Sequence, residues 1–247
     1  CAPFGATPLS GQESVPTRVV VRAVSNDAKI IGSGVGGARV MIRDAVTGQI
    51  LASGVQSGST GDTGAIMGER ARGAPVFDSV GAGAFEARLD LTAPTQVVIE
   101  AEGPLGAGHA LQRASTTLLL VPGHDVVGNG VVRTLHGFTV EVVDAPASGR
   151  PGHALDLVAR VTMLCGCPTE PGGMWDADRY SLDVALVQGE RVVATAPLTW
   201  SGERSVYDGS VVVPDGTRAG DYALRIVAVD AERANAGMVL HPVRVGG

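Results

Sequence analysis

Residues 37–54 read GARVMIRDAVTGQILASG, and their pattern is the clearest indication of the fold. The first half of this stretch largely alternates apolar with polar residues, ending at Arg43 and Asp44. The next four residues, Ala45-Val46-Thr47-Gly48, have the composition of a turn, and a second apolar run starts at Ile50. A period of two is typical of a β-strand with one face in the core. This stretch therefore predicts a strand, a tight turn and a second strand.

The composition of the whole chain favours the same class of structure. The 247 residues are 45% hydrophobic but only 4% aromatic, so the core has to be built from Val, Ala, Leu and Ile. The 35 glycines and 14 prolines show no collagen period and indicate many turns between short strands. A chain of this length holds one large β domain or two smaller ones. We predict an all-β fold of two tandem antiparallel β-sandwich domains.

The first domain is expected to cover residues 17–122. Further strands are predicted at residues 17–23, 85–91, 96–101 and 115–121, with 85–91 and 96–101 paired as a hairpin across the turn at 92–95. Between the hairpin at 37–54 and the strand at 85–91 lies a Gly/Ser/Thr-rich stretch, 54–84, with little periodicity. Long loops of this kind inside compact domains are usually functional or disordered. We therefore expect residues 54–84 to form a long loop that is a candidate partner contact.

The hairpin at 37–54 carries a resemblance to a known family. Its turn, Val46-Thr47-Gly48 between two short strands, resembles the carboxypeptidase-regulatory or transthyretin-like β-sandwich family. The resemblance extends over about a hundred residues, and its motifs are short. It implies a β-sandwich that scaffolds or binds other molecules.

The second domain is expected at residues 131–247, after a Gly-rich linker at 123–130. Seven strands are predicted, at residues 138–143, 154–163, 181–187, 191–197, 205–213, 221–230 and 239–245. Residues 214–226, PDGTRAGDYALRI, form a turn followed by a strand that begins at Asp221 and Tyr222. This pattern resembles the penultimate strand of bacterial immunoglobulin-like domains, and implies an immunoglobulin-like sandwich.

The N-terminal segment begins at Cys1 and continues through small, polar and Pro-rich residues to Gly11. It resembles the mature end of a bacterial lipoprotein, in which the cysteine carries a diacylglyceryl group and an acyl chain. The resemblance implies a covalent lipid on Cys1, a tether at residues 1–16, and a membrane-anchored protein in the periplasm or another extracytoplasmic space. More than one acyl chain on a single residue anchors stably. Lys29 is the one lysine among 19 basic residues, a usage typical of a GC-rich genome.

The most unusual segment, residues 163–176, reads MLCGCPTEPGGMWD. An oxidising compartment favours a disulfide between Cys165 and Cys167, which would staple an irregular loop. Two thiols and the thioethers of Met163 and Met174 would also suit Cu(I). Two free thiols are the third reading. If the pair is oxidised, we expect the loop to present Met174 and Trp175 as apolar contacts for a neighbouring subunit.

The sequence offers no other motif with defensible chemistry. The net charge of −6 and scattered basic residues argue against nucleic acid as a partner. Residues 32–37 match G-x-G-x-x-G, but a strand follows instead of the helix that binds a pyrophosphate. The five histidines form no recognised metal motif, and no catalytic motif is evident.

The function predicted from these observations is a structural one. We expect a non-catalytic, lipid-anchored accessory subunit, with no cofactor, on the outer face of a membrane-bound complex, respiratory or photosynthetic being two candidates. One alternative is a periplasmic copper-handling lipoprotein that uses Met163, Cys165, Cys167 and Met174. The other is a polymer- or carbohydrate-binding module, for which Trp175, Trp200 and Tyr207 provide few aromatic side chains.

Overall fold

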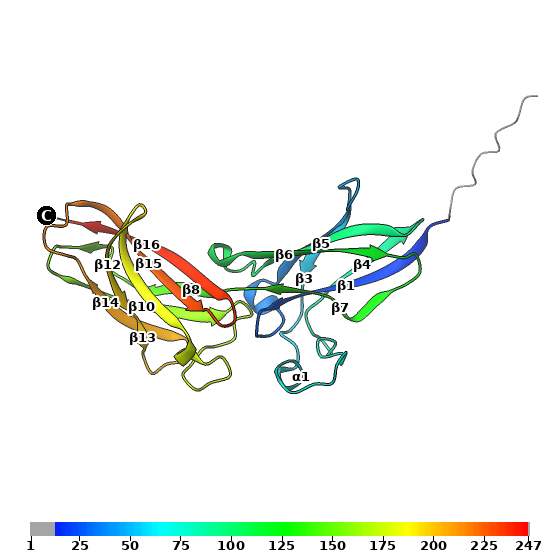
Figure 1. The fold of residues 1–247 in the computed structure, drawn as a ribbon, viewed down its shortest axis with the longest axis horizontal. Coiled ribbons are helices and arrows are strands. Elements are labelled where there is room, and N and C mark those ends of the chain that lie inside the picture. Colours follow the sequence, from blue (N-terminus) through cyan, green and yellow to red (C-terminus); the bar gives the residue numbers. More distant parts are fainter. Residues whose placement is uncertain (1–12, 247) are drawn as a thin grey trace, which may run out of the picture.

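In a computed structural model of the chain, residues 13–246 are described, and they form two β-sandwiches one after the other (Figure 1). The prediction of an all-β fold with two tandem sandwiches is confirmed. Figure 1 shows an elongated body, with the start of β1 at one tip and the C-terminal end of the last strand at the other. Among residues 13–246, no helix is long and apolar enough to cross a membrane.

The first sandwich packs a three-stranded sheet, ordered β4-β1-β7, against a four-stranded sheet, ordered β3-β2-β5-β6. Alternate residues of each strand, such as Val19 and Val21 or Val97 and Ile99, fill the core between the sheets. The strands are β1 (Val15–Ser25), β2 (Ala38–Asp44), β3 (Ile50–Gln56), β4 (Phe85–Leu91), β5 (Thr95–Gly103), β6 (Gln112–Leu120) and β7 (Val126–Leu135); the 3-10 helices are η1 (Ser33–Val35) and η2 (Gly108–Ala110).

The predicted hairpin at 37–54 is present, since β2 and β3 pair antiparallel. The predicted hairpin between 85–91 and 96–101 is wrong. Strand β4 pairs with β1, whereas β5 pairs with β2 and β6 in the opposite sheet. The turn at 92–95 crosses from one sheet to the other. A short turn between two strands of alternating residues can form a hairpin or can connect two facing sheets. The local sequence pattern therefore does not show whether the two strands pair.

The predicted linker at 123–130 and the domain limit at 122 need correction. Residues 126–135 form strand β7, which pairs parallel with β1 in the first sandwich. Gly128 and Gly130 have positive φ angles, and a Cβ on Gly130 would lie 2.3 Å from the carbonyl oxygen of Val20. The register shifts beside Val20. The glycines thus allow the backbones of β7 and β1 to come close together and to shift register within the sheet. They do not mark a break between domains. Val15 and Pro16, assigned to the tether, belong to β1.

The segment 57–84 is an ordered cover on the first sandwich. It contains α1 (Thr63–Met67), whose Ile66 packs with Val24 and Ile30 in a small separate core. The guanidinium of Arg22 on β1 donates to the carbonyl oxygen of Gly83 (2.8 Å) and to Asp78 (2.9 Å). This buried side chain therefore attaches the segment to the outer face of the three-stranded sheet.

The second sandwich packs a four-stranded sheet, β13-β14-β10-β8, against a five-stranded sheet, β12-β11-β15-β16-β9. Its core is mainly aliphatic, with residues such as Leu157, Val184 and Leu224, and also contains aromatic side chains such as Phe138. The seven strands expected from the sequence are present with small changes at their ends. The elements are β8 (Phe138–Asp144), β9 (Ser148–Gly149), β10 (Ala154–Met163), η3 (Ala177–Arg179), β11 (Ser181–Gln188), β12 (Arg191–Pro197), β13 (Thr199–Trp200), β14 (Val206–Val212), β15 (Gly220–Asp230) and β16 (Asn235–Val245).

Candidate functional site

The loop that follows β10 connects the cores of the two sandwiches. Leu164 is fully buried and belongs to the core of the first sandwich, although its neighbour Met163 belongs to that of the second. In return, Ala28 from a turn of the first sandwich packs into the core of the second. Each core therefore contains a residue supplied by the other domain. Such an exchange opposes the relative motion that is the default between domains.

Cys165 and Cys167 lie in this same loop, joined by a disulfide with their Cα atoms 5.5 Å apart. Both are buried in the second core. The turn between them is closed by hydrogen bonds from the Met163 N–H to the Cys167 carbonyl oxygen (3.0 Å) and from the Gly166 N–H to that of Met163 (2.8 Å). Gly166 has a φ of +78°, and a Cβ there would lie 2.9 Å from Val35 of the first sandwich. The disulfide therefore closes a tight turn at the junction.

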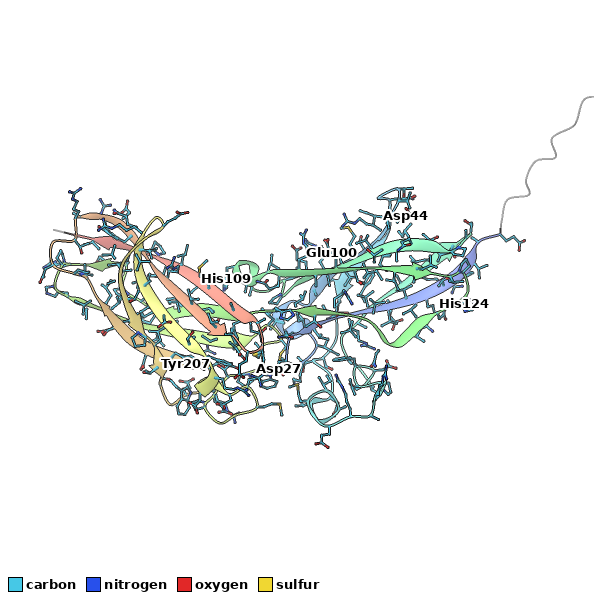
Figure 2. All side chains as sticks on the ribbon, in the orientation of Figure 1. Asp27, Asp44, Glu100, His109, His124 and Tyr207 are labelled. Atoms are coloured by element: carbon cyan, nitrogen blue, oxygen red, sulfur yellow. A yellow bond between two sulfur atoms is a disulfide. The ribbon has the colours of Figure 1, made fainter. Side chains whose placement is uncertain are left out.

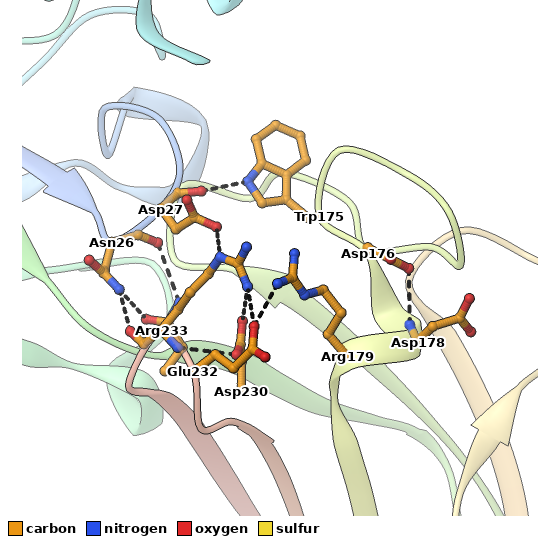
Figure 3. Close-up of polar contacts among 10 residues, drawn as sticks. Asn26, Asp27, Trp175, Asp176, Asp178, Arg179, Asp230, Glu232 and Arg233 are labelled. Atoms are coloured by element: carbon orange, nitrogen blue, oxygen red, sulfur yellow. Dashed lines mark hydrogen bonds and ion pairs between the residues drawn. The ribbon is translucent and has the colours of Figure 1, made fainter. Parts of the chain in front are cut away.

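Trp175 also belongs to the junction, which corrects the expectation that it contacts a neighbouring subunit. Its side chain is 8% exposed, and its indole N–H donates to the carbonyl oxygen of Asp27 in the first sandwich at 3.0 Å (Figure 3). Its neighbour Met174 is 57% exposed. The sequence indicated an apolar anchor here, but the surface that it anchors is the other domain of the same chain.

Polar side chains complete the junction beside Trp175. The Asn26 amide donates to the carbonyl oxygen of Arg233 (2.6 Å), and the Asn235 side-chain oxygen accepts from the Gly137 N–H (2.9 Å). The Arg233 guanidinium forms ion pairs with Asp27 across the junction and with Asp230 in its own domain (Figure 3). Because Asp230 is almost fully buried, this pairing compensates a charge that would otherwise be costly.

The residues predicted for copper and for polymer binding are separated in the structure. Met163 is buried beside the cysteines, whereas Met174 is exposed. Within residues 13–246, no group of three His, Cys, Asp or Glu side chains is arranged to hold a metal ion. Of the aromatic residues considered for polymer binding, Trp175 and Tyr207 are buried, and only Trp200 is exposed.

Tyr207, labelled in Figure 2, is buried in the core of the second sandwich. Its hydroxyl lies 2.8 Å from Thr169 Oγ1, which in turn donates to the carbonyl oxygen of Val161. Burial raises the pKa of Tyr207 above its ordinary value. The hydroxyl therefore stays neutral at physiological pH and serves as a hydrogen-bonding group of the core.

We expect thiol labelling of the denatured chain to modify Cys165 and Cys167 only after reduction. Replacing both by serine should lower the free energy of unfolding by ~1–2 kcal/mol, because a bridge over so short a loop removes little chain entropy from the unfolded state. Quantitative labelling and urea denaturation measure the two effects. Labelling of both residues without reductant would contradict the disulfide, and stoichiometric copper in native material would favour the copper-handling alternative.

The outer face of the five-stranded sheet is a site that the sequence reasoning missed. On β15 the even positions from Tyr222 to Ala228 are in the core, so Ala223, Arg225, Val227 and Val229 point outward. The outward residues of β16 are likewise mostly apolar, and Met238 and Leu240 are 50% and 55% exposed. An outer face of an antiparallel sheet is commonly polar.

The opposite sheet of the same sandwich has a mixed outer face, in which polar residues lie beside apolar ones such as Val158 and the 54% exposed Val212. Asp156, Arg160 and Thr162 on β10 alternate there with core residues, and Asp208 and Ser210 lie on β14 beside them. The outward residues of β15 and β16 include a larger share of apolar side chains, which makes the outer face of the five-stranded sheet a candidate interaction surface. The sequence does contain one indication of this surface. Residues 222–229 form a nearly continuous apolar run, which is typical of a strand that is covered on both faces.

Comparison with known proteins adds little. No model of a protein family matches the chain, and no curated protein matches it. The fibronectin(III)-like modules of Clostridium thermocellum CbhA match 93% of this chain and 92% of theirs, with 12% identity and a TM-score of 0.28. Domains 4 and 5 of the S-layer protein SbsC match 95% of this chain and 100% of theirs, with 12% identity and a TM-score of 0.29.

An engineered protein solved at 1.98 Å matches 52% of this chain with 18% identity and a TM-score of 0.31, and the match spans 24% of that protein. Similarity at these TM-scores carries no argument about family or function. The transthyretin-like and immunoglobulin-like memberships therefore stay predictions, and the chain is characterised by its own fold, two consecutive antiparallel β-sandwiches.

Proposed function

We propose that this chain is a non-catalytic structural subunit, tethered to a membrane by a lipid on Cys1, that docks on the outer, periplasmic face of a membrane-bound protein complex. A respiratory or photosynthetic complex is the class of partner we propose. Cys1 and the rest of residues 1–12 lie outside the described residues, so the tether rests on the resemblance of that segment to lipoproteins.

The observation that carries the proposal is the interlocked junction. Leu164 and Ala28 exchange between the two cores, and Trp175 bonds across the boundary. A junction of this kind holds the second sandwich at a fixed distance and orientation from the start of β1, at the opposite tip of the molecule (Figure 1). A stiff spacer suits a subunit that places a binding surface at a set height above a membrane.

The electrostatics support a protein partner over a nucleic acid. The net charge is −6. On the outer face of the four-stranded sheet of the first sandwich, Arg39 and Arg113 pair with Glu102, while Arg43 pairs with Glu100. These arginines are therefore largely neutralised within the sheet, and do not form the concentrated basic patch that phosphate binding requires.

We expect intact-mass analysis of protein from native membranes to show a diacylglyceryl group and at least one further acyl chain on Cys1. The chain should also co-migrate with a larger membrane complex after mild solubilisation, because a docking subunit stays with its partner. A Cys1→Ala variant is the control and should appear in the soluble fraction, since the anchor needs the thiol. An unmodified Cys1 in native material, or migration of the lipidated chain away from every larger complex, would contradict the proposal.

A further inference from the structure

The outer face of the five-stranded sheet is built of cross-strand rows that are largely apolar. In one row Met238 lies opposite Val227, which lies opposite Asp183. In the next, Leu240 lies opposite Arg225, which lies opposite Ala185. The third row contains Pro242, Ala223, Val187 and Val192. Asp183 and Arg225 are thus two charges of opposite sign among these apolar rows, and the row beyond Pro242 and Ala223 is the exposed ion pair of Asp221 and Arg244.

These two charges have no ion-pair partner within 4.0 Å among residues 13–246. Charges at the centre of an apolar surface are costly to cover unless the covering molecule supplies an opposite charge. The covering surface therefore has to be apolar, with one acidic and one basic group a similar distance apart. The face itself has this composition.

We infer that the outer face of the five-stranded sheet pairs with the same face of a second copy of this chain. In a two-fold symmetric interface each contact occurs twice, so Arg225 of one copy meets Asp183 of the other and the reverse. The side chains of Met238, Leu240 and Val227 from both copies then fill the space between the sheets, as they do in the two layers of a sandwich.

The size of the face is sufficient for such a dimer. Strand β15 has 11 residues. At ~3.4 Å per residue, and with four strands ~4.8 Å apart, the face covers roughly 600 Å² on each copy. Standard protein interfaces bury about 800 Å² on each partner. With a contribution from the residues around it, the face reaches the size that a specific dimer needs.

Membrane tethering would strengthen this pairing, and in this respect the inference rests on the proposed function. Two copies anchored to one membrane share their orientation and have a raised effective concentration. The dimer would then be the form of the subunit that docks on the larger complex. The face-to-face pairing itself needs no membrane, so it can be measured apart from the tether.

The first experiment measures the mass of the full chain in solution, with Cys1 replaced by serine so that no lipid is attached. Analytical ultracentrifugation should show a dimer at micromolar concentration. Leu240→Asp and Met238→Asp should each weaken dimerisation at least a hundredfold, because a carboxylate would be buried in an apolar interface. Leu119→Asp is the matched control: Leu119 is also 55% exposed, but lies on β6 of the first sandwich, and this variant should remain a dimer.

The second experiment tests the charges. Arg225→Asp and Asp183→Arg should each weaken dimerisation by roughly tenfold or more, because each brings like charges together at both ends of the interface. An equimolar mixture of the two variants should recover the affinity of the unchanged protein, since a heterodimer places opposite charges together again. Circular dichroism should show all variants folded, as every substituted side chain points outward.

A monomer up to 100-micromolar chain concentration, or failure of the two charge variants to restore each other, would overturn the dimer. Equal loss of dimer in Leu119→Asp would overturn the assignment to this face. These outcomes are separate from the proposed function: a monomeric chain that still migrates with a membrane complex contradicts only the dimer. A dimeric chain that carries no lipid in native membranes contradicts only the tethered subunit.

Discussion

Replacing Leu164 by alanine is expected to lower the free energy of unfolding by ~2–4 kcal/mol and to separate the unfolding of the two sandwiches. Leu164 is fully buried in the first core, although the chain on either side of it belongs to the second domain. Truncation to alanine leaves a cavity that rigid neighbours fill only in part, which is why buried leucines cost this much. It also removes one of the apolar contacts that join the two cores, leaving that of Ala28 in place.

Urea denaturation followed in both domains measures this effect. A single transition is expected for the unchanged protein and two transitions for Leu164→Ala. Leu119→Ala provides the control, because this leucine is half exposed and its truncation should change the free energy by less than ~0.5 kcal/mol. If Leu164→Ala lowered stability but kept one transition, the coupling would have to come from the remaining junction contacts of Ala28, Trp175 and Arg233.

The second large effect is expected from Arg22→Met, which should release the segment 57–84 from the first sandwich. The Arg22 side chain is 5% exposed and bonds to the carbonyl oxygens of Gly83 and Gly128 and to Asp78. Methionine keeps the apolar part of the side chain but leaves buried carbonyl groups without donors, at ~1–3 kcal/mol for each. We expect a loss of ~3 kcal/mol in total and cleavage within 57–84 at least tenfold faster.

Limited proteolysis with mass spectrometry locates the cleavage. Arg18→Met is the matched control, because Arg18 lies on the same strand but its side chain is 56% exposed in a surface ion pair with Glu86. That variant should be cleaved like the unchanged protein, since exposed ion pairs contribute little. Equal protection of 57–84 in Arg22→Met would show that the small core around Ile66 holds the segment without Arg22.

The positions of strands could be predicted from the sequence because they depend on local patterns. Residues 154–163 and 191–197 were expected as strands from local composition and turns, and β10 and β12 have these bounds. The pairing of strands could not be predicted in the same way. Whether β4 and β5 share a sheet depends on contacts with β1 and β2, which are distant in sequence.

The candidate sites were predicted less well, for physical reasons that particular residues make clear. Gly128 and Gly130 lie in a Gly-rich stretch that resembles a linker. Their positive φ angles instead allow the backbones of β7 and β1 to come close together. Trp175 was identified as an anchor, yet its partner, the Asp27 carbonyl, is 148 residues away. The outer face around Leu240 was overlooked because a continuous apolar run does not say which of its residues point outward.

We expect the junction to hold the two sandwiches as one rigid body, because residues of each domain are buried in the core of the other. Residual dipolar couplings from the backbone amides test it most directly, measured on the full chain with Cys1→Ser and Leu240→Asp to keep it unlipidated and monomeric. We predict that couplings from both sandwiches fit a single alignment tensor when the two domains are placed as in the structure (Figure 1). Two tensors of different magnitude, one for each sandwich, would mean that the domains reorient independently and would contradict a rigid junction.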